Sequence, residues 1–197
     1  MICMRNKEGN KEADILEAAI KVFAKFGYHN SRISQIAKEA GIASGSVYLY
    51  YKNKEEVLAS IFKKVWEQLY NEISRICERK DLTAIDKLEY LIDLIFDIFS
   101  VNPSLAIVFV NEQIHLQKET ALFMRYYENF FKKGEEIIEE GIKKGSINPN
   151  IDVKTFKFFL LGGMRYLLEN WAKDVKNFPL TTLRQNVKLI IKKGILG

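Results

Sequence analysis

The sequence predicts an all-α protein, and three observations support this fold class. Over most of the 197 residues, apolar side chains recur at intervals of three and four, the period of an amphipathic helix and not of a strand. Only three prolines and eleven glycines interrupt the chain. A hydrophobic content of 48% at this length is enough to bury a sizeable core, so one large helical domain or two small ones are expected.

The N-terminal quarter is predicted to contain a pair of short helices around a glycine. An amphipathic helix is expected from Lys11 to Phe26. The hydroxyl of Ser31 is expected to cap the next helix, and Gly41 to end it in a left-handed conformation. A third helix, rich in small and hydroxylated side chains, then runs to about Tyr50.

The third helix and the residues after it carry groups suited to DNA. Small side chains let a helix N-terminus approach a duplex, tyrosine hydroxyls donate to phosphates, and lysines supply charge. Residues 1–54 hold nine Lys or Arg and five Asp or Glu, a net charge of +4, whereas residues 55–197 hold 21 and 20, a net charge of +1. Positive charge is therefore in excess where DNA binding is expected. The alternative is an ordinary helical pair with a solvated surface.

The segment from Ser31 to Glu55 resembles the DNA-binding domain of TetR-family repressors. The resemblance rests on Ile36-Ala37, Ala40-Gly41-Ile42, Gly45-Ser46-Val47-Tyr48, Tyr50-Tyr51 and Lys54-Glu55. It implies a helix-turn-helix domain over residues 1–54 that binds a double-stranded DNA operator. It also implies phosphate contacts from Ser31, Gln35, Tyr48, Tyr50 and Lys54, and base contacts from Ser44, Ser46 and Val47, with Lys52 adding charge. Ala43 stands where the family usually has a hydroxyl residue, so a cap or phosphate contact is missing there or passes to Ser44.

Residues 55–197 are predicted to form a second helical domain for ligand binding and dimerisation. A long helix opens at Lys54 and bridges to this domain, so a shift at its far end would swing the attached DNA reader. Further helices are expected at about 83–100, 104–117, 119–144, 152–173 and 180–193, which gives about nine in all. The run from Leu105 to Val110 has strand-like composition, but its helical context favours a helix.

Aromatic residues are numerous in the second domain. We expect most of them to pack in the core and the rest to line a long apolar cavity, with a few polar groups to orient a ligand. The candidate pocket residues are Phe96, Phe109, Asn111, Tyr127, Phe130 and Arg165, with Gln113, His115 and Glu169 as further polar candidates. Taken alone, His115 is more typical of a surface or structural histidine.

Two adjacent glycines, Gly162 and Gly163, lie in the middle of a predicted helix, where they cost stability relative to alanine. They indicate close approach of another helix, and in the TetR family this region forms the dimer. The expected homodimer interface comprises Phe159, Gly162, Gly163, Leu167, Trp171, Leu183, Val187 and Ile190. The alternative is a packing face within one chain. A two-fold dimer would present two recognition helices to successive major grooves, which implies a palindromic operator.

Other classes of protein find little support in the sequence. No nucleophile–base pair, phosphate-binding glycine loop or paired metal ligands are evident, so no enzyme activity, cofactor or metal is predicted. Cys3 and Cys77 fit a reducing cytoplasm. Residues 1–10 lack the apolar core of a secretion signal and are expected to be a disordered end or a basic arm. No apolar run reaches membrane-spanning length, so no membrane partner is expected.

The leading hypothesis is a ligand-responsive transcriptional repressor, released from its operator by a small apolar effector. Residues 48–56 and 105–108 further resemble the fatty-acid-degradation regulators of the family, which implies long-chain acyl-CoA as effector. Arg125, Lys132 or Arg165 would then be available to its phosphates. The alternatives are an effector-independent DNA-binding protein with a fully packed interior and, with less support, a cytosolic lipid carrier.

Overall fold

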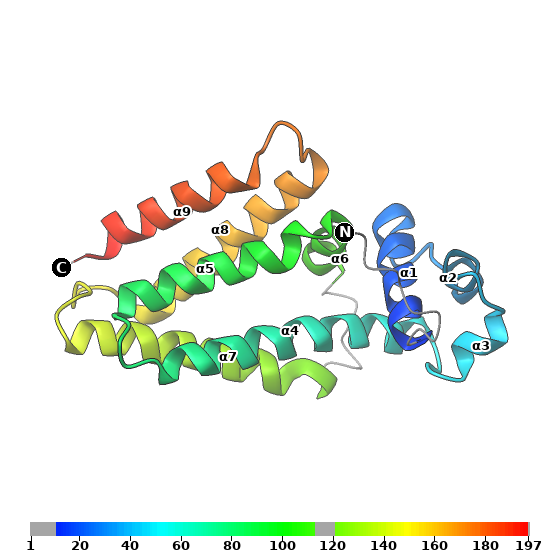
Figure 1. The fold of residues 1–197 in the computed structure, drawn as a ribbon, viewed down its shortest axis with the longest axis horizontal. Coiled ribbons are helices and arrows are strands. Elements are labelled where there is room, and N and C mark those ends of the chain that lie inside the picture. Colours follow the sequence, from blue (N-terminus) through cyan, green and yellow to red (C-terminus); the bar gives the residue numbers. More distant parts are fainter. Residues whose placement is uncertain (1–10, 113–120, 197) are drawn as a thin grey trace, which may run out of the picture.

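The computed structural model describes residues 11–112 and 121–196, and these residues form nine α-helices and no strand (Figure 1). The predicted all-α fold class is confirmed. Some predictions lie outside the described residues: the N-terminal arm at 1–10, the end of the helix expected at 104–117, and the candidates Gln113 and His115.

Three helices form a small unit at one end of the molecule: α1 (Lys11–Phe26), α2 (Ile33–Ala40) and α3 (Ser44–Tyr48) (Figure 1). α2 packs on both of its neighbours. Phe23, Ile36 and Val47 are fully buried between them. Gly41 ends α2 with φ of 69°, the left-handed conformation expected from the sequence.

The start of α2 differs from the prediction. Ser31 does not cap the helix, because its side chain is buried and its hydroxyl donates to the carbonyl of Gly27 at 2.7 Å. Arg32 occupies the cap position, and its backbone N–H donates to Oε1 of Gln35 at 2.7 Å. The serine therefore closes the loop after α1, and the glutamine closes the first turn of α2.

One long helix, α4 (Lys54–Glu78), joins the small unit to the rest of the chain (Figure 1). Its 25 residues span roughly 37 Å at 1.5 Å per residue. Asn53 caps it by accepting the backbone N–H of Glu56 at 2.8 Å. Near its start α4 contacts α1, and along its length it packs mainly on α7, so it is continuous between the two parts of the molecule.

The remaining helices are α5 (Ala84–Ser100), α6 (Pro103–Asn111), α7 (Ala121–Lys143), α8 (Val153–Lys173) and α9 (Leu180–Ile195). α6 packs against both α8 and α1, while α9 packs on α5. Residues 105–110 are helical, as their context predicted. No single described helix is long and apolar enough to cross a membrane; α5 and α6 reach that length only jointly, and they meet at 108°.

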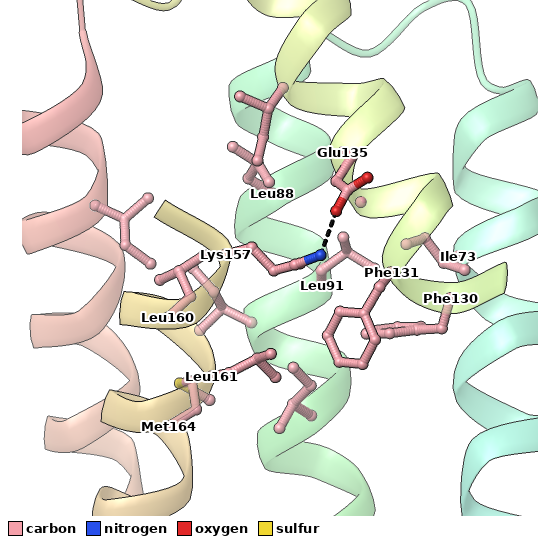
Figure 2. A pocket seen from close by; sticks show the side chains of 15 residues that line it. Ile73, Leu88, Leu91, Phe130, Phe131, Glu135, Lys157, Leu160, Leu161 and Met164 are labelled. Carbon is pink, nitrogen blue, oxygen red and sulfur yellow. Dashed lines mark hydrogen bonds and ion pairs between the residues drawn. The ribbon is translucent and has the colours of Figure 1, made fainter. Parts of the chain in front are cut away.

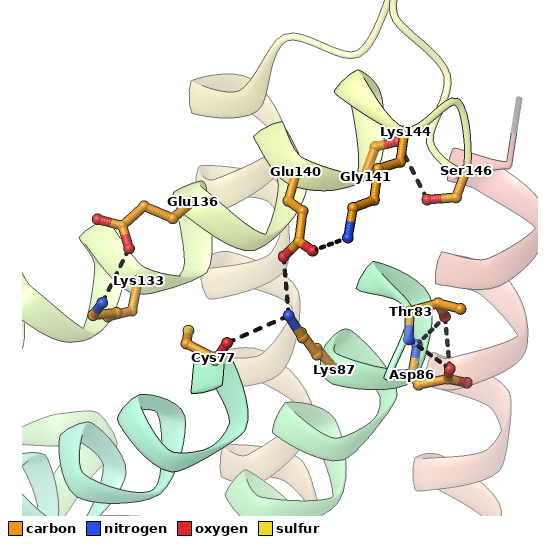
Figure 3. A network of polar contacts seen from close by, with 10 residues as sticks. All are labelled: Cys77, Thr83, Asp86, Lys87, Lys133, Glu136, Glu140, Gly141, Lys144 and Ser146. Atoms are coloured by element: carbon orange, nitrogen blue, oxygen red, sulfur yellow. Dashed lines mark hydrogen bonds and ion pairs between the residues drawn. The ribbon is translucent and has the colours of Figure 1, made fainter. Parts of the chain in front are cut away.

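A polar network ties α5 to α7 and α4 at the end far from the small unit (Figure 3). Lys87 is buried, and its Nζ donates to Oε2 of Glu140 at 2.9 Å and to the carbonyl of Cys77 at 3.5 Å. Hydrogen bonds from Lys144 and Lys87 lower the pKa of Glu140. Because a buried ammonium without a partner would be costly, this network fixes how α5 lies on α7.

Candidate DNA-binding surface and ligand cavity

The outer side of α3 and the turn after it form an exposed polar and aromatic surface. Tyr48 is 57% exposed and Tyr50 is 43% exposed, so both phenols are available for contact. Ser44 and Lys52 are also exposed, whereas Ser46 and Gln35 are half-buried. These six predicted DNA-binding residues lie on or near one end of the molecule with their side chains accessible: Gln35, Ser44, Ser46, Tyr48, Tyr50 and Lys52.

Two residues predicted to contact DNA have side chains that point into the protein instead. Val47 has no exposed surface and packs in the core of the three-helix unit, so it cannot read a base edge. Ser31 is 2% exposed and donates inward, so its side chain cannot reach a phosphate. Leu49, which the sequence analysis did not select, is instead 83% exposed between the two tyrosines. Its exposed apolar side chain is therefore part of this surface.

Lys54 has a structural role that the sequence did not reveal. Its Nζ donates to the carbonyls of Tyr28, His29 and Ser31 at 2.7, 3.0 and 3.1 Å. An ammonium has three donors, so a phosphate contact would require Lys54 to release one of these carbonyls. Burial lowers the pKa of Lys54, and the negative charge of Glu112 partly opposes this shift.

Glu112 connects the three-helix unit to the second domain. It follows α6, is buried, and accepts the backbone N–H of Tyr28 on Oε1 at 3.2 Å. Burial and the charges of Glu55 and Glu112 raise the pKa of Tyr28 to about 12. Sequence reasoning missed this contact because 84 residues separate the two partners. The one local feature of the sequence that could have indicated it is the carboxylate of Glu112 directly after the apolar helix α6.

The second domain contains two apolar cavities. A cavity of about 340 Å³ lies among α4, α5, α6, α7 and α8, with Trp66, Phe109 and Tyr127 in its wall. A smaller one of about 110 Å³ lies nearer the far end of α4 (Figure 2). The two cavities share five lining residues: Ile95, Phe130, Phe131, Leu161 and Met164. They are therefore adjacent compartments of one apolar interior.

Four of the six predicted pocket residues line the larger cavity: Phe109, Tyr127, Phe130 and Arg165. Arg165 donates a hydrogen bond to the carbonyl of Val110. The other two predictions were wrong for the described cavities. Phe96 has no exposed surface and belongs to the core, and Asn111 is exposed at the end of α6.

Aromatic rings crowd around Trp66 at the wall of the larger cavity. Its ring centroid lies 4.9 Å from that of Tyr127, 5.4 Å from Phe109 and 5.6 Å from Phe131. Phe109 also stacks on Phe62 at 5.0 Å. This cluster joins α4, α6 and α7, so a molecule that displaces one of these rings would push on all three helices.

Between α7 and α8 a hollow on the surface leads toward both cavities. It shares Glu135 and Lys157 with the smaller cavity, and Tyr127 and Phe158 with the larger one. Nζ of Lys157 lies 2.5 Å from Oε1 of Glu135, so an ion pair crosses this hollow (Figure 2). Glu128 and Lys132 complete its charged lining.

The outer sides of α8 and α9 expose large apolar side chains. Phe159 is 68% exposed and Ile190 is 61% exposed. A Cβ added at Gly162 or Gly163 would meet no atom of residues 11–112 or 121–196 within 4 Å, so neither glycine makes room for another helix of that part of the chain. Trp171 and Val187, predicted at a dimer interface, are instead buried in their own chain, and Leu167 and Leu183 are half-buried.

A helix-turn-helix unit on a long helix, joined to a hollow helical domain, defines a DNA-binding transcriptional regulator with a ligand cavity. Residues 15–61 match the family model described as bacterial regulatory proteins, tetR family. Residues 62–194, more than half of the chain, match the C-terminal region of YsiA-like proteins. The chain belongs to the TetR family of bacterial regulators, as its sequence motifs indicated.

Within this family, the chain is similar to regulators of fatty acid metabolism. The chain is 33% identical over 190 residues to the fatty acid metabolism regulator protein of Bacillus subtilis strain 168, covering 94% of this chain and 95% of that protein. The crystal structure of FadR from Bacillus subtilis in complex with stearoyl-CoA aligns with a TM-score of 0.79 at 31% identity, over 93% and 98% of the two chains. The fatty acid degradation regulator FadR from Bacillus halodurans aligns at 0.78 and 30%, over 94% and 96%.

Proposed function

We propose that this regulator is a transcriptional repressor that binds a palindromic operator as a homodimer and is released by long-chain acyl-CoA. The observation that carries the proposal is the hollow apolar interior, which opens between α7 and α8 beside charged side chains. Such a shape suits a long acyl chain with a polar head outside. The similarity to FadR in complex with stearoyl-CoA supports the same ligand class.

On the DNA side, the accessible residues of α3 and the following turn carry the proposed contacts. Ser44, Ser46 and Leu49 would meet base edges, and Tyr48, Tyr50 and Lys52 would meet phosphates. Val47 and Ser31 support this surface from beneath, since both are buried. Because contacts to phosphates release counterions from DNA, we expect them to supply much of the affinity and to make it fall as the salt concentration rises.

The exposed face of α8 and α9 supports the proposed dimer. Phe159 and Ile190 would be buried against a second copy, and the open surface over Gly162 and Gly163 would let two α8 helices approach closely. A two-fold axis at this face would place two α3 surfaces to read one operator in two successive major grooves. The cytoplasm is the proposed compartment, because the operator is there.

Two connections lead from the cavity to the DNA-binding unit. Phe109 and Val110 line the larger cavity, and Glu112, which follows them, holds the loop between α1 and α2. Trp66 lines the same cavity on α4, whose first residue, Lys54, holds that loop from the other side. Acyl-CoA would release DNA only if it binds the DNA-incompetent arrangement more tightly than the competent one.

The test is a titration of the protein on the DNA upstream of its own gene, at fixed salt, with palmitoyl-CoA or with CoA alone. We expect tight binding that palmitoyl-CoA weakens by at least fivefold and CoA does not affect. Tight binding that ignores palmitoyl-CoA would refute the effector and favour an effector-independent DNA-binding protein. Palmitoyl-CoA binding without specific DNA binding would refute the repressor and favour a lipid carrier.

A further inference from the structure

We propose that the ion pair between Lys157 and Glu135 is a gate that selects effectors with an anionic head. In this exchange the head, a phosphoryl or carboxyl group, replaces the Glu135 carboxylate as the partner of Lys157. The inference rests on the proposed function, because it concerns the entrance to the same cavity. It assigns a specificity role to two side chains that the sequence did not single out.

The position of the pair is the first argument. Lys157 on α8 and Glu135 on α7 line both the surface hollow and the smaller cavity, so they stand where solvent meets the apolar interior. Phe131 and Leu161 line the hollow and both cavities. A ligand whose tail fills the interior from this side must leave its head beside Lys157 (Figure 2).

The scarcity of charge is the second argument. Among the residues that the structure describes, Lys157 and Glu135 are the charged ones in the smaller cavity's lining, and Arg165 is the charged one in the lining of the larger. Arg165 already donates to a backbone carbonyl of α6. The partner of Lys157 is instead a side chain on another helix, which can move away without unfolding backbone. Lys157 is therefore the cation whose present partner, a carboxylate at the mouth of the smaller cavity, an anionic head can replace directly.

Partial burial makes the exchange selective. The side chain of Lys157 is 24% exposed and that of Glu135 is 34% exposed, and the Lys157 ammonium lies 5.4 Å from the centroid of the Phe158 ring. Charges in such a site interact more strongly than in bulk water. An anionic head can replace Glu135 and keep Lys157 paired, whereas a neutral head offers Lys157 no new partner, so the ion pair stays closed beside it.

This arrangement predicts opposite effects from the two halves of one ion pair. Lys157→Gln removes the cation, so affinity for an anionic ligand should fall about ten- to a hundredfold, the range for one charge-assisted hydrogen bond. Glu135→Gln removes the competitor, so the same affinity should rise severalfold. A pair that served only to hold α7 on α8 would give the same sign for both substitutions.

The experiment is calorimetric titration of the full chain with three probes of equal tail length: myristoyl-CoA, myristate and the neutral monomyristoyl glycerol. The wild type is compared with Lys157→Gln and Glu135→Gln. The controls are Lys133→Gln and Glu136→Gln, which break another ion pair of α7, at 3.2 Å, that lines neither cavity nor the hollow. Thermal unfolding of each variant reports whether the fold survives.

For each of the two anionic probes, we expect Lys157→Gln to lower the affinity and Glu135→Gln to raise it. For the neutral probe we expect less than a twofold change in affinity with either substitution. We expect no change in affinity in the control variants. A shift with myristoyl-CoA alone would identify phosphate as the recognised group, and a shift with both would identify any anion. Equal weakening by both substitutions, or unchanged affinity, would overturn the gate. If the gate is overturned but palmitoyl-CoA still releases the operator, the proposed function stands. If the wild type binds neither anionic probe, the gate and the proposed acyl-CoA effector are both refuted.

Discussion

The exposed apolar face of α8 and α9 makes a quantitative prediction for Phe159→Ala. Complete burial of a phenylalanine side chain stabilises by about 1.5–3 kcal/mol. Since Phe159 is 68% exposed in one chain, its burial by a partner would contribute about 1–2 kcal/mol. A two-fold interface contains the residue twice, so the substitution should weaken the dimer by about 2–4 kcal/mol. This corresponds to a dissociation constant raised roughly 30- to 700-fold.

Sedimentation equilibrium over a range of protein concentrations measures this change directly. Leu49→Ala is the matched control, because Leu49 is also exposed and apolar but lies on the DNA-binding unit. Gly163→Ala gives an independent check. It should favour the helix within one chain, since no described residue occupies the space of the added methyl, yet it should weaken the dimer, because the methyl would hold the two α8 helices apart. A dimer equally tight in Phe159→Ala and in the wild type would refute this interface.

The DNA-binding surface and the contact between domains give two further predictions. Tyr48→Ala should lower operator affinity without lowering the free energy of unfolding, whereas Val47→Ala should lower that free energy by roughly 1–3 kcal/mol. Operator titration measures the first effect and chemical denaturation the second. The reverse pattern would contradict the assigned orientations of the two side chains. Glu112→Ala removes the acceptor of the Tyr28 N–H, so palmitoyl-CoA should still bind but release the operator less. By reciprocity, the operator's effect on palmitoyl-CoA affinity should shrink by the same factor, and an unchanged ratio in either titration would exclude Glu112 from the coupling.

The helices were predictable because their signals are local. The periodicity of α1 and α4, the left-handed Gly41 and the break at Pro103 are each decided within a few residues of sequence. The family motif likewise located the DNA-binding unit. In both cases neighbours in the chain determine the outcome.

The direction of individual side chains was not predictable in the same way. The motif placed Val47 beside DNA, but packing in the core of the three-helix unit turns it inward. Phe96 and Phe109 look equivalent in sequence, and only the assembled helices decide which of them lines a cavity. The Glu135–Lys157 pair joins separate helices, although Lys157, Leu161 and Arg165 recur at intervals of four and could have marked the cavity side of α8.

The placement of α8 has a consequence for how the regulator responds to the concentration of its effector. Phe158 and Gly162 belong to the wall of the larger cavity, yet both are exposed on the outer side of the helix, next to Phe159 and Gly163. In a dimer built on this face, the paired α8 helices would lie between the two cavities. Occupation of one cavity would then alter the wall of the other, and we expect the response to acyl-CoA to be sigmoidal rather than hyperbolic.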